Sequence, residues 1–427
     1  MKRTALKGLV DWKSSTRRKP LVLKGARQVG KTWLMKCFGQ DHFKNMAYVD
    51  FYNNDRMKEL FSGDFDIPRL IEGLQIETRE KISPQETLIV FDEVQELPLA
   101  LSSLKYFNEN APEYAVVAGG SLLGVALHEG ESFPVGKVDY ANLYPLDFCE
   151  FLEGIGETQL SEMLKACDWQ MITTFKSKLI DYLRKYLFVG GMPESVLVYS
   201  EDRDFDSVRK VQNSILMAYN DDFSKHIPRN LLPKVRSVWD SMPRMLARER
   251  KSFSPGVIKK GSRFKDYEDA LQWLVDAGLV HKVKQVSAPS IPLKNYTTDA
   301  FKLYLLDVGL LSCMAELEAR TLLEGSSIFK EFKGSLTENY ACQELTAQSN
   351  TLFYWSSERT AEVDFVFKHN DIVLPMEVKA EENLQGKSLR VYSEKYKPEL
   401  ALRASMRDYR EDGWLTNIPL YGLGAWK

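Results

Sequence analysis

The segment Gly25–Thr32 has the residue types and spacing of a phosphate-binding loop, G-x-x-x-x-G-K-[ST]. Its two glycines leave room for backbone N–H groups to turn inward around phosphate oxygens, next to a helix N-terminus that already favours anions. Lys31 is predicted to reach the β- and γ-phosphates, and Thr32 to bind Mg²⁺ through its hydroxyl. ATP and Mg²⁺ are therefore the expected ligands. The predicted binding residues are Gly25, Ala26, Arg27, Gln28, Val29, Gly30, Lys31 and Thr32.

Two carboxylates follow an apolar run further along the chain. Leu88–Phe91 has the character of a buried strand, and Asp92 and Glu93 stand directly after it. Ligands of parallel α/β sheets bind at the carboxyl ends of the strands. We therefore expect Asp92 to be a Mg²⁺ partner and Glu93 to be the general base, or the residue that orients the attacking water.

Two more residues are candidates for a catalytic role around the γ-phosphate. Ser121 follows the strand Tyr114–Ala118, and its hydroxyl could contact the γ-phosphate or the attacking water; the alternative is a serine that only forms a turn. Lys137 precedes a further strand, and it could bring positive charge to the phosphates or be an ordinary lysine at a strand end. The sequence does not decide between these alternatives.

A second group of charged residues lies in the C-terminal part. Asp364 lies in the first of two apolar strands, and Glu377 and Lys379 lie in the second, after a polar turn. Glu377 and Lys379 share a sheet face because side chains alternate with a period of two. Antiparallel pairing about the turn is expected to place Asp364 opposite Met376, within one residue of Glu377. Glu338, near the start of a predicted helix, adds a third carboxylate. Such acids can hold Mg²⁺ while a lysine positions or activates water.

The elements that must position these residues change in type along the chain. Strand and helix patterns alternate up to about residue 145, as in a parallel sheet with crossover helices. Residues 156–225 have a helical, charged pattern, interrupted by a helix-breaking Gly-Gly-Met-Pro turn at 190–193. Residues 231–287 have the pattern of a winged helix, with a helix at Asp266–Ala277 and an alternating strand from Leu279. Six basic residues there could contact nucleic acid, although winged helices also dock proteins: Lys259, Lys260, Arg263, Lys265, Lys282 and Lys284.

Four motifs together resemble the prokaryotic AAA-type ATPases that carry a C-terminal domain of unknown function related to PD-(D/E)xK nucleases. They are Gly25–Thr32, Phe91–Gln95, Gly120–Gly124 and Pro145–Leu152. The resemblance implies that residues 156–230 form a helical lid and that Glu338, Asp364, Glu377 and Lys379 form a nuclease-like site. Two positions depart from the family pattern. Lys137 stands where an arginine is frequent, and lysine lacks the two-pronged hydrogen bonding of a guanidinium; Val363 replaces the proline of the nuclease motif.

We therefore expect a multidomain α/β protein. Its predicted parts are an AAA-type P-loop ATPase core with a parallel sheet (1–155), a helical lid (156–230), a winged helix (231–290) and a restriction-endonuclease-like α/β domain (291–427). The predicted function is Mg²⁺-dependent ATP hydrolysis coupled to a macromolecular substrate, with nucleic acid first. The alternatives are an ATP-gated regulatory or interaction protein whose nuclease-like domain does not cut, and a metal-dependent nuclease gated by ATP. DNA, RNA, a protein partner at the winged helix and a homo-oligomer all stay open.

The composition limits the kinds of partner and site that the protein can have. Lys and Arg total 57 against 59 Asp and Glu, so any surface for nucleic acid or membrane must be local. The five cysteines are odd in number and lack C-x-x-C spacing, which argues against a disulfide framework and a structural zinc site. No uncharged apolar run approaches the length of about 18 residues that a membrane helix needs. A cytoplasmic protein without a membrane partner is expected.

Overall fold

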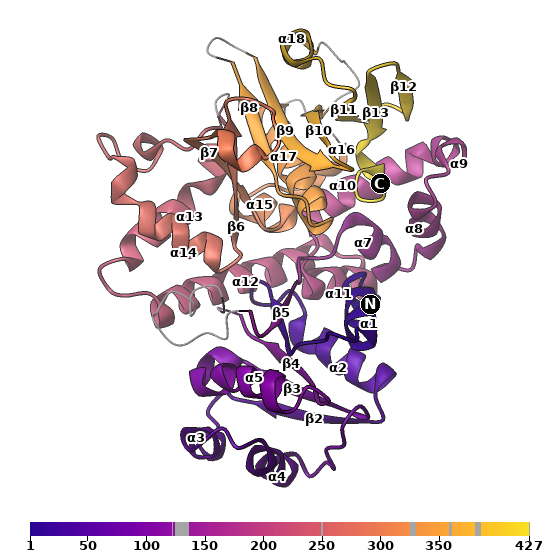
Figure 1. Cartoon of the computed structure of the whole chain (residues 1–427). Helices are drawn as coiled ribbons and strands as arrows, with labels where there is room; N and C mark the ends of the chain where they lie inside the picture. The colour runs from indigo at the N-terminus through magenta and orange to yellow at the C-terminus, as the bar shows by residue number, and fades with distance from the viewer. Residues whose placement is uncertain are drawn as a thin grey trace. The chain divides into compact units, whose positions relative to one another are not determined.

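The computed structural model of the chain describes residues 1–121, 123, 136–248, 251–324, 330–357, 361–380 and 386–426. The chain forms two compact units, each described by itself below (Figure 1). The N-terminal unit comprises residues 2–144 and 276–278, and the C-terminal unit comprises residue 1, 145–275 and 279–427.

The N-terminal unit is built on a five-stranded sheet in the order β2-β3-β4-β1-β5. All four neighbouring pairs are parallel, as predicted. The strands are β1 (Leu21–Lys24), β2 (Asn45–Asp50), β3 (Thr87–Asp92), β4 (Ala115–Gly119) and β5 (Asp139–Asn142). Every residue of β3 is buried, as the apolar run predicts for a strand inside a parallel sheet.

Helices precede and connect the strands of this sheet; the first lies before β1, and the others are crossover connections. They are α1 (Ala5–Ser14), α2 (Lys31–His42), α3 (Asp55–Ser62), α4 (Ile67–Thr78) and α5 (Pro98–Asn110). Alternate residues of the strands, including Ile89 and Phe91, form one core with α3, α4 and α5. Val90 and Asp92 therefore point to the opposite face, because successive side chains of a strand alternate.

Helices make up the first part of the C-terminal unit. They are α7 (Phe148–Gly154), α8 (Thr158–Lys165), α9 (Trp169–Thr174), α10 (Lys176–Val189), α11 (Pro193–Asp202), α12 (Phe205–His226), α13 (Leu232–Leu246) and α14 (Glu268–Asp276). Helices α15 (Val308–Met314), α16 (Ala319–Glu324), α17 (Lys330–Ala347) and α18 (Lys387–Tyr396) follow. Among the residues described, no helix combines the length and the apolar character needed to cross a bilayer.

The Gly-Gly-Met-Pro turn separates α10 from α11 and packs against two other segments. Gly190 has a φ of 74°, and the N–H of Gly191 donates to Oδ2 of Asp307 at 2.6 Å. The N–H of Leu146 donates to the Gly191 carbonyl at 2.7 Å, and a Cβ added at Gly191 would lie 2.0 Å from the Leu146 carbonyl oxygen. The two glycines therefore permit a close backbone approach, for which the sequence had suggested only a helix break.

A mixed sheet of eight strands forms the rest of this unit, in the order β12-β13-β11-β10-β9-β8-β6-β7. Its strands are β6 (Val280–Val286), β7 (Thr297–Leu305), β8 (Phe353–Ser356), β9 (Glu362–His369), β10 (Ile372–Val378), β11 (Ala401–Ser405), β12 (Arg410–Asp412) and β13 (Leu415–Pro419). The predicted wing strand is β6, which pairs with β7 and β8 and thus belongs to this sheet. Residues 254–260 contain only a 3-10 turn, Pro255–Val257. The winged helix and the restriction-endonuclease-like fold stay predictions.

The register of β9 and β10 differs by one residue from the expected one. Met376 pairs with Phe365 rather than with Asp364, which places Asp364 across from Glu377. The hairpin loop consists of Asn370 and Asp371 alone, and both have positive φ, 45° and 68°. Asn and Asp tolerate this conformation in two-residue turns, and this short turn sets the observed register.

Candidate functional site

The phosphate-binding loop joins β1 to α2 in the N-terminal unit. Gly30 has φ 95° and ψ 26°, a left-handed conformation that favours glycine. A Cβ added at Gly25 would lie 2.3 Å from the Leu143 carbonyl oxygen, so this position also requires glycine. Helix α2 begins at Lys31, and the unpaired N–H groups of a helix's first turn attract anions. The loop is thus shaped to hold phosphate.

Lys31 lies inside this loop. Its side chain is buried, and Nζ donates to the carbonyl oxygens of Gly25 at 2.9 Å and Ala26 at 2.7 Å. Burial lowers the pKa of Lys31 to about 8, although the nearby carboxylates of Glu93 and Asp92 oppose the shift. The ammonium group is held by two uncharged acceptors that phosphate oxygens could replace.

Thr32, Asp92 and Tyr48 meet on the α2 face of the sheet. Asp92 Oδ2 accepts hydrogen bonds from Thr32 Oγ1 at 2.7 Å and from the Tyr48 hydroxyl at 2.8 Å. Tyr48 pairs with Val90 in β3 and so points to the same face as Asp92. A hydroxyl and a carboxylate are the hard oxygen ligands that Mg²⁺ prefers, so Thr32 and Asp92 fit the ion. Tyr48 is identified as a partner of Asp92 only by the pairing of β2 with β3.

Glu93 lies directly beyond β3 in an unusual backbone conformation, with φ 49° and ψ 44°. Its Oε2 accepts a hydrogen bond from Gln95 Nε2 at 2.5 Å. A Cβ added at Gly120, beyond the end of β4, would lie 2.1 Å from Gln95 Oε1, so glycine there lets the amide approach. Strained backbone and an oriented carboxylate are typical of functional positions. No role for Gln95 could be predicted from the sequence, because its contact with Glu93 depends on the shape of the turn.

The other two candidates lie at different places in the sheet. Ser121 is half-buried just after β4; its γ-phosphate role stays a prediction, and residues 122 and 124–135, which include Ser132–Val135 and part of the Gly120–Gly124 motif, lie outside the described residues. Lys137 precedes β5, which runs parallel to β1, so it lies at the edge of the sheet opposite the phosphate-binding loop. There Lys137 Nζ pairs with Glu109 at 2.8 Å. This position favours the reading of Lys137 as a lysine at a strand end, and its contact with the phosphates stays a prediction.

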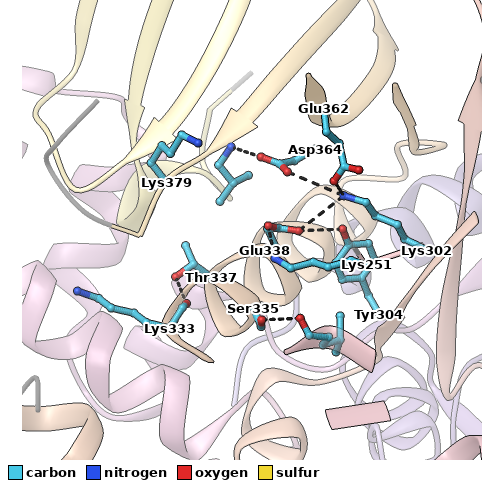
Figure 2. Close-up of polar contacts among 12 residues, drawn as sticks. Lys251, Lys302, Tyr304, Lys333, Ser335, Thr337, Glu338, Glu362, Asp364 and Lys379 are labelled. Atoms are coloured by element: carbon cyan, nitrogen blue, oxygen red, sulfur yellow. Dashed lines mark hydrogen bonds and ion pairs between the residues drawn. The ribbon is translucent and has the colours of Figure 1, made fainter. Parts of the chain in front are cut away.

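In the C-terminal unit, a buried lysine connects the predicted nuclease acids. Lys302, on β7, has no exposed surface, and its Nζ lies 2.5 Å from Glu362 Oε1. The same Nζ lies 3.9 Å from Glu338 Oε2 and 3.9 Å from Asp364 Oδ1. Figure 2 shows the ammonium among these three carboxylates. Lys302 was not predicted as a site residue, although a single lysine within the apolar run of β7 is a signal of a buried charge.

A second lysine and a tyrosine contact the same cluster. Lys251 Nζ pairs with Glu338 Oε1, and the Tyr304 hydroxyl donates to Glu338 Oε2 at 3.2 Å (Figure 2). An isolated β-bridge between Ser252 and Lys302 holds the segment of Lys251 beside β7. Helix α17, which carries Glu338, is fixed on β7 because Asn339 bonds both the N–H and the carbonyl of Leu305. Glu338 thus has partners from two segments, that of Lys251 and strand β7.

The electrostatics of this cluster follow from burial and close charges. Burial raises the pKa of Asp364, and the neighbouring Glu338 raises it further, to about 7. Burial also favours the neutral form of Glu338, but Lys251 and Lys302 outweigh it and lower the Glu338 pKa. For Lys302, burial opposes the charge, and the three carboxylates overcome it and raise the pKa.

Glu377 and Lys379 lie in a separate group of contacts. Glu377 Oε1 lies 3.2 Å from Lys379 Nζ, and Oε2 lies 3.4 Å from Arg403 Nε. The N–H of Val378 donates to Asp364 Oδ2 at 2.8 Å, which connects the two groups. Within the described part of the chain, no three His, Cys, Asp or Glu side chains are arranged to hold a metal ion. Magnesium binding by Glu338, Asp364 and Glu377 stays a prediction.

The basic residues between α13 and β6 are mostly on the surface. Lys259, Lys260, Arg263 and Lys265 are exposed. Lys282 is less exposed, with Nζ 4.4 Å from the centroid of the Phe301 ring. The exposed lysines and arginine of this cluster therefore present positive charge to solvent, where an anionic partner can bind.

Comparisons with known proteins agree with the N-terminal site. The AAA domain model matches residues 17–152. Two domains of unknown function match the remainder, DUF8612 over residues 180–321 and DUF4143 over residues 333–422. With the parallel sheet and the loop geometry, the match shows that the N-terminal unit is an AAA-type P-loop domain.

The chain is also similar to three proteins over most of their lengths. It is 22% identical over 386 residues to the uncharacterized protein MJ1544 of Methanocaldococcus jannaschii, covering 88% of this chain and 78% of that protein. Among solved structures, the Walker-type ATPase of Pyrococcus abyssi matches with 15% identity and a TM-score of 0.45, covering 74% of this chain and 95% of the other. The Orc1 protein of Aeropyrum pernix, solved in complex with DNA, matches with 14% identity and a TM-score of 0.30, covering 73% and 90%.

Proposed function

We propose that this protein is a Mg²⁺-dependent ATPase whose hydrolysis is coupled to a macromolecular substrate, with nucleic acid first. One observation carries the proposal: Thr32 at the start of α2 and Asp92 at the end of β3 meet at 2.7 Å, beside the buried ammonium of Lys31. Residues 60 positions apart thus place the two oxygen types of a magnesium site next to a phosphate-binding loop.

Each residue has a role that follows from its position. Lys31 would exchange its two carbonyl acceptors for phosphate oxygens, and Thr32 and Asp92 would hold Mg²⁺. The ion, when bound, neutralises charge on the phosphates. Glu93 would accept a hydrogen bond from the attacking water and orient it, while the Gln95 amide keeps the carboxylate in place. Ser121 is the proposed contact to the γ-phosphate.

A comparison of the two glutamates that flank β3 tests this assignment. Glu93→Gln should keep ATP affinity and lose turnover by about 10²- to 10⁴-fold, the range for a positioned acid or base. Lys31→Ala should instead lose affinity, because Lys31 contacts phosphate in the ground state. The matched control is Glu86→Gln, since Glu86 lies just before β3, at its other end, and pairs with Lys44. Equal ATPase rates for Glu93→Gln and wild type would remove Glu93 from its role.

The exposed basic residues between α13 and β6 support nucleic acid as the substrate. Phosphate neutralisation needs clustered lysine and arginine, and Lys259, Lys260 and Arg263 provide them on a short segment. A protein that docks on the same segment is the competing partner. Salt dependence separates the two, because counterion release makes nucleic-acid affinity fall steeply with salt.

A second candidate function is an ATP-gated regulatory or interaction protein whose nuclease-like domain does not cut. The basic partners of Glu338, Asp364 and Glu377 favour it over a nuclease gated by ATP. Incubating DNA and RNA with the purified protein, Mg²⁺ and ATP separates these alternatives. Cleavage by the wild type that disappears in Asp364→Asn would show that the protein is a nuclease.

A further inference from the structure

The acids of the C-terminal cluster do not fit a divalent metal in the arrangement that the structure has. A metal site presents carboxylate oxygens to one point that a cation can occupy. Here Glu338, Asp364 and Glu362 all face the Nζ of Lys302, at 3.9, 3.9 and 2.5 Å. A cation is already present at that point, and it is covalently part of the chain.

We propose that Lys302 is the resident counter-ion of this acidic cluster and takes the place of a divalent metal between Glu338 and Asp364. This inference is independent of the ATPase activity, and it gives the acids a structural role that needs no metal. The acids hold β7, β9 and α17 together through one ammonium group.

The burial of Lys302 supports the proposal. A fully buried ammonium is very costly unless carboxylates surround it, and a buried carboxylate has the same need. The side chain also lies over the Tyr354 ring, with Nζ 5.0 Å from its centroid, which adds a favourable cation–π contact. A metal entering the cluster would have to displace a lysine with no exposed surface.

The charges of the cluster are consistent with this arrangement. Lys251 and Lys302 bring two positive charges to Glu338, Glu362 and Asp364, and the N–H of Val378 adds a hydrogen bond to Asp364. Adding a divalent ion to the two lysines would leave an excess of buried positive charge. Glu377 has its own partners in Lys379 and Arg403.

Counting bound manganese tests the proposal on the full chain without nucleotide. Mn²⁺ binding is measured by electron paramagnetic resonance for wild type, Asp92→Asn and Asp364→Asn. The proposal expects Asp364→Asn to bind as much Mn²⁺ as wild type, because no metal depends on Asp364. A loss of bound Mn²⁺ in Asp364→Asn relative to wild type, whatever Asp92→Asn binds, would overturn it. This comparison needs no variant of Lys302.

Removing the lysine gives the converse test. Lys302→Met keeps the length of the side chain and removes its charge, so the remaining carboxylates should repel one another and lower the melting temperature. Mn²⁺ should then bind in the vacated position and raise the melting temperature. The combination Lys302→Met with Asp364→Asn should abolish that rise. The matched control is Lys379→Met, which should gain no Mn²⁺ because Arg403 still pairs with Glu377.

A folded Lys302→Met protein that gains no Mn²⁺ would contradict the proposal that the lysine occupies a metal position. If Lys302→Met does not fold with or without Mn²⁺, the wild-type and Asp364→Asn counts decide. Nuclease activity of wild type that requires Mn²⁺ and is lost in Asp364→Asn would also overturn the proposal.

Discussion

The affinity for ATP should depend on pH through Lys31. In the nucleotide-free protein, burial lowers the pKa of this ammonium to about 8, and its Nζ donates to two uncharged carbonyls. Phosphate oxygens stabilise the charged form, so the pKa should rise when ATP binds. Binding therefore takes up a proton. Affinity is full below the pKa of the nucleotide-free protein and falls as the pH rises through it.

The size of the effect follows from the protonated fraction. With a pKa of about 8, that fraction falls from roughly three quarters at about pH 7.5 to roughly 3% at about pH 9.5. The dissociation constant for ATP should then rise about 25-fold, or about 2 kcal/mol, provided that the bound lysine stays charged. Burial and the bond to Asp92 raise the pKa of the neighbouring Tyr48, so its hydroxyl keeps its proton in this range.

Fluorescence titration with a labelled ATP at constant free Mg²⁺ measures this dependence. Calorimetry in buffers of different ionisation enthalpy counts the proton that is taken up. Lys31→Arg is the matched control, since a guanidinium stays protonated throughout and should give a flat profile whatever its affinity. The reasoning is refuted if wild type and Lys31→Arg have the same dependence on pH.

Three other predictions concern separate parts of the molecule. Gln95→Ala should lower turnover by about 10- to 100-fold at unchanged ATP affinity, because Glu93 loses a hydrogen bond to a charged acceptor; steady-state kinetics check it, and an effect on affinity alone would contradict it. Reversing Lys259, Lys260 and Arg263 to Glu should weaken nucleic-acid binding and flatten its salt dependence, whereas affinity indifferent to salt and to charge would favour a protein partner. Gly191→Ala should lower the free energy of unfolding in urea by about 1–3 kcal/mol or more, since its Cβ would overlap the Leu146 carbonyl. Gly334→Ala in α17 has open space around the new Cβ and should be neutral or slightly stabilising, so equal losses for the two glycines would argue against the packing explanation.

The sequence by itself determined the parts of the site that are contiguous in the chain. The phosphate-binding loop is encoded by eight successive residues, and its glycines, lysine and threonine have their roles because the backbone between a strand and a helix has few conformations. The apolar run Leu88–Phe91 likewise identifies a strand that is buried on both faces of a parallel sheet. These features depend on local geometry, so Lys31, Thr32, Asp92 and Glu93 could be assigned roles without a structure.

Only the tertiary structure decided which distant residues complete the sites. Tyr48 reaches Asp92 because β2 pairs in register with β3, and Lys137 lies far from the loop because β5 is parallel to β1. The two-residue turn between β9 and β10 gives a register that differs by one residue from the expected one. Lys302 meets Glu338 and Asp364 through strand order and helix packing over separations of 36 and 62 positions (338 − 302 and 364 − 302). Such contacts follow from the energy of the whole fold, in which buried charges must find partners, and no local pattern specifies which partner that is.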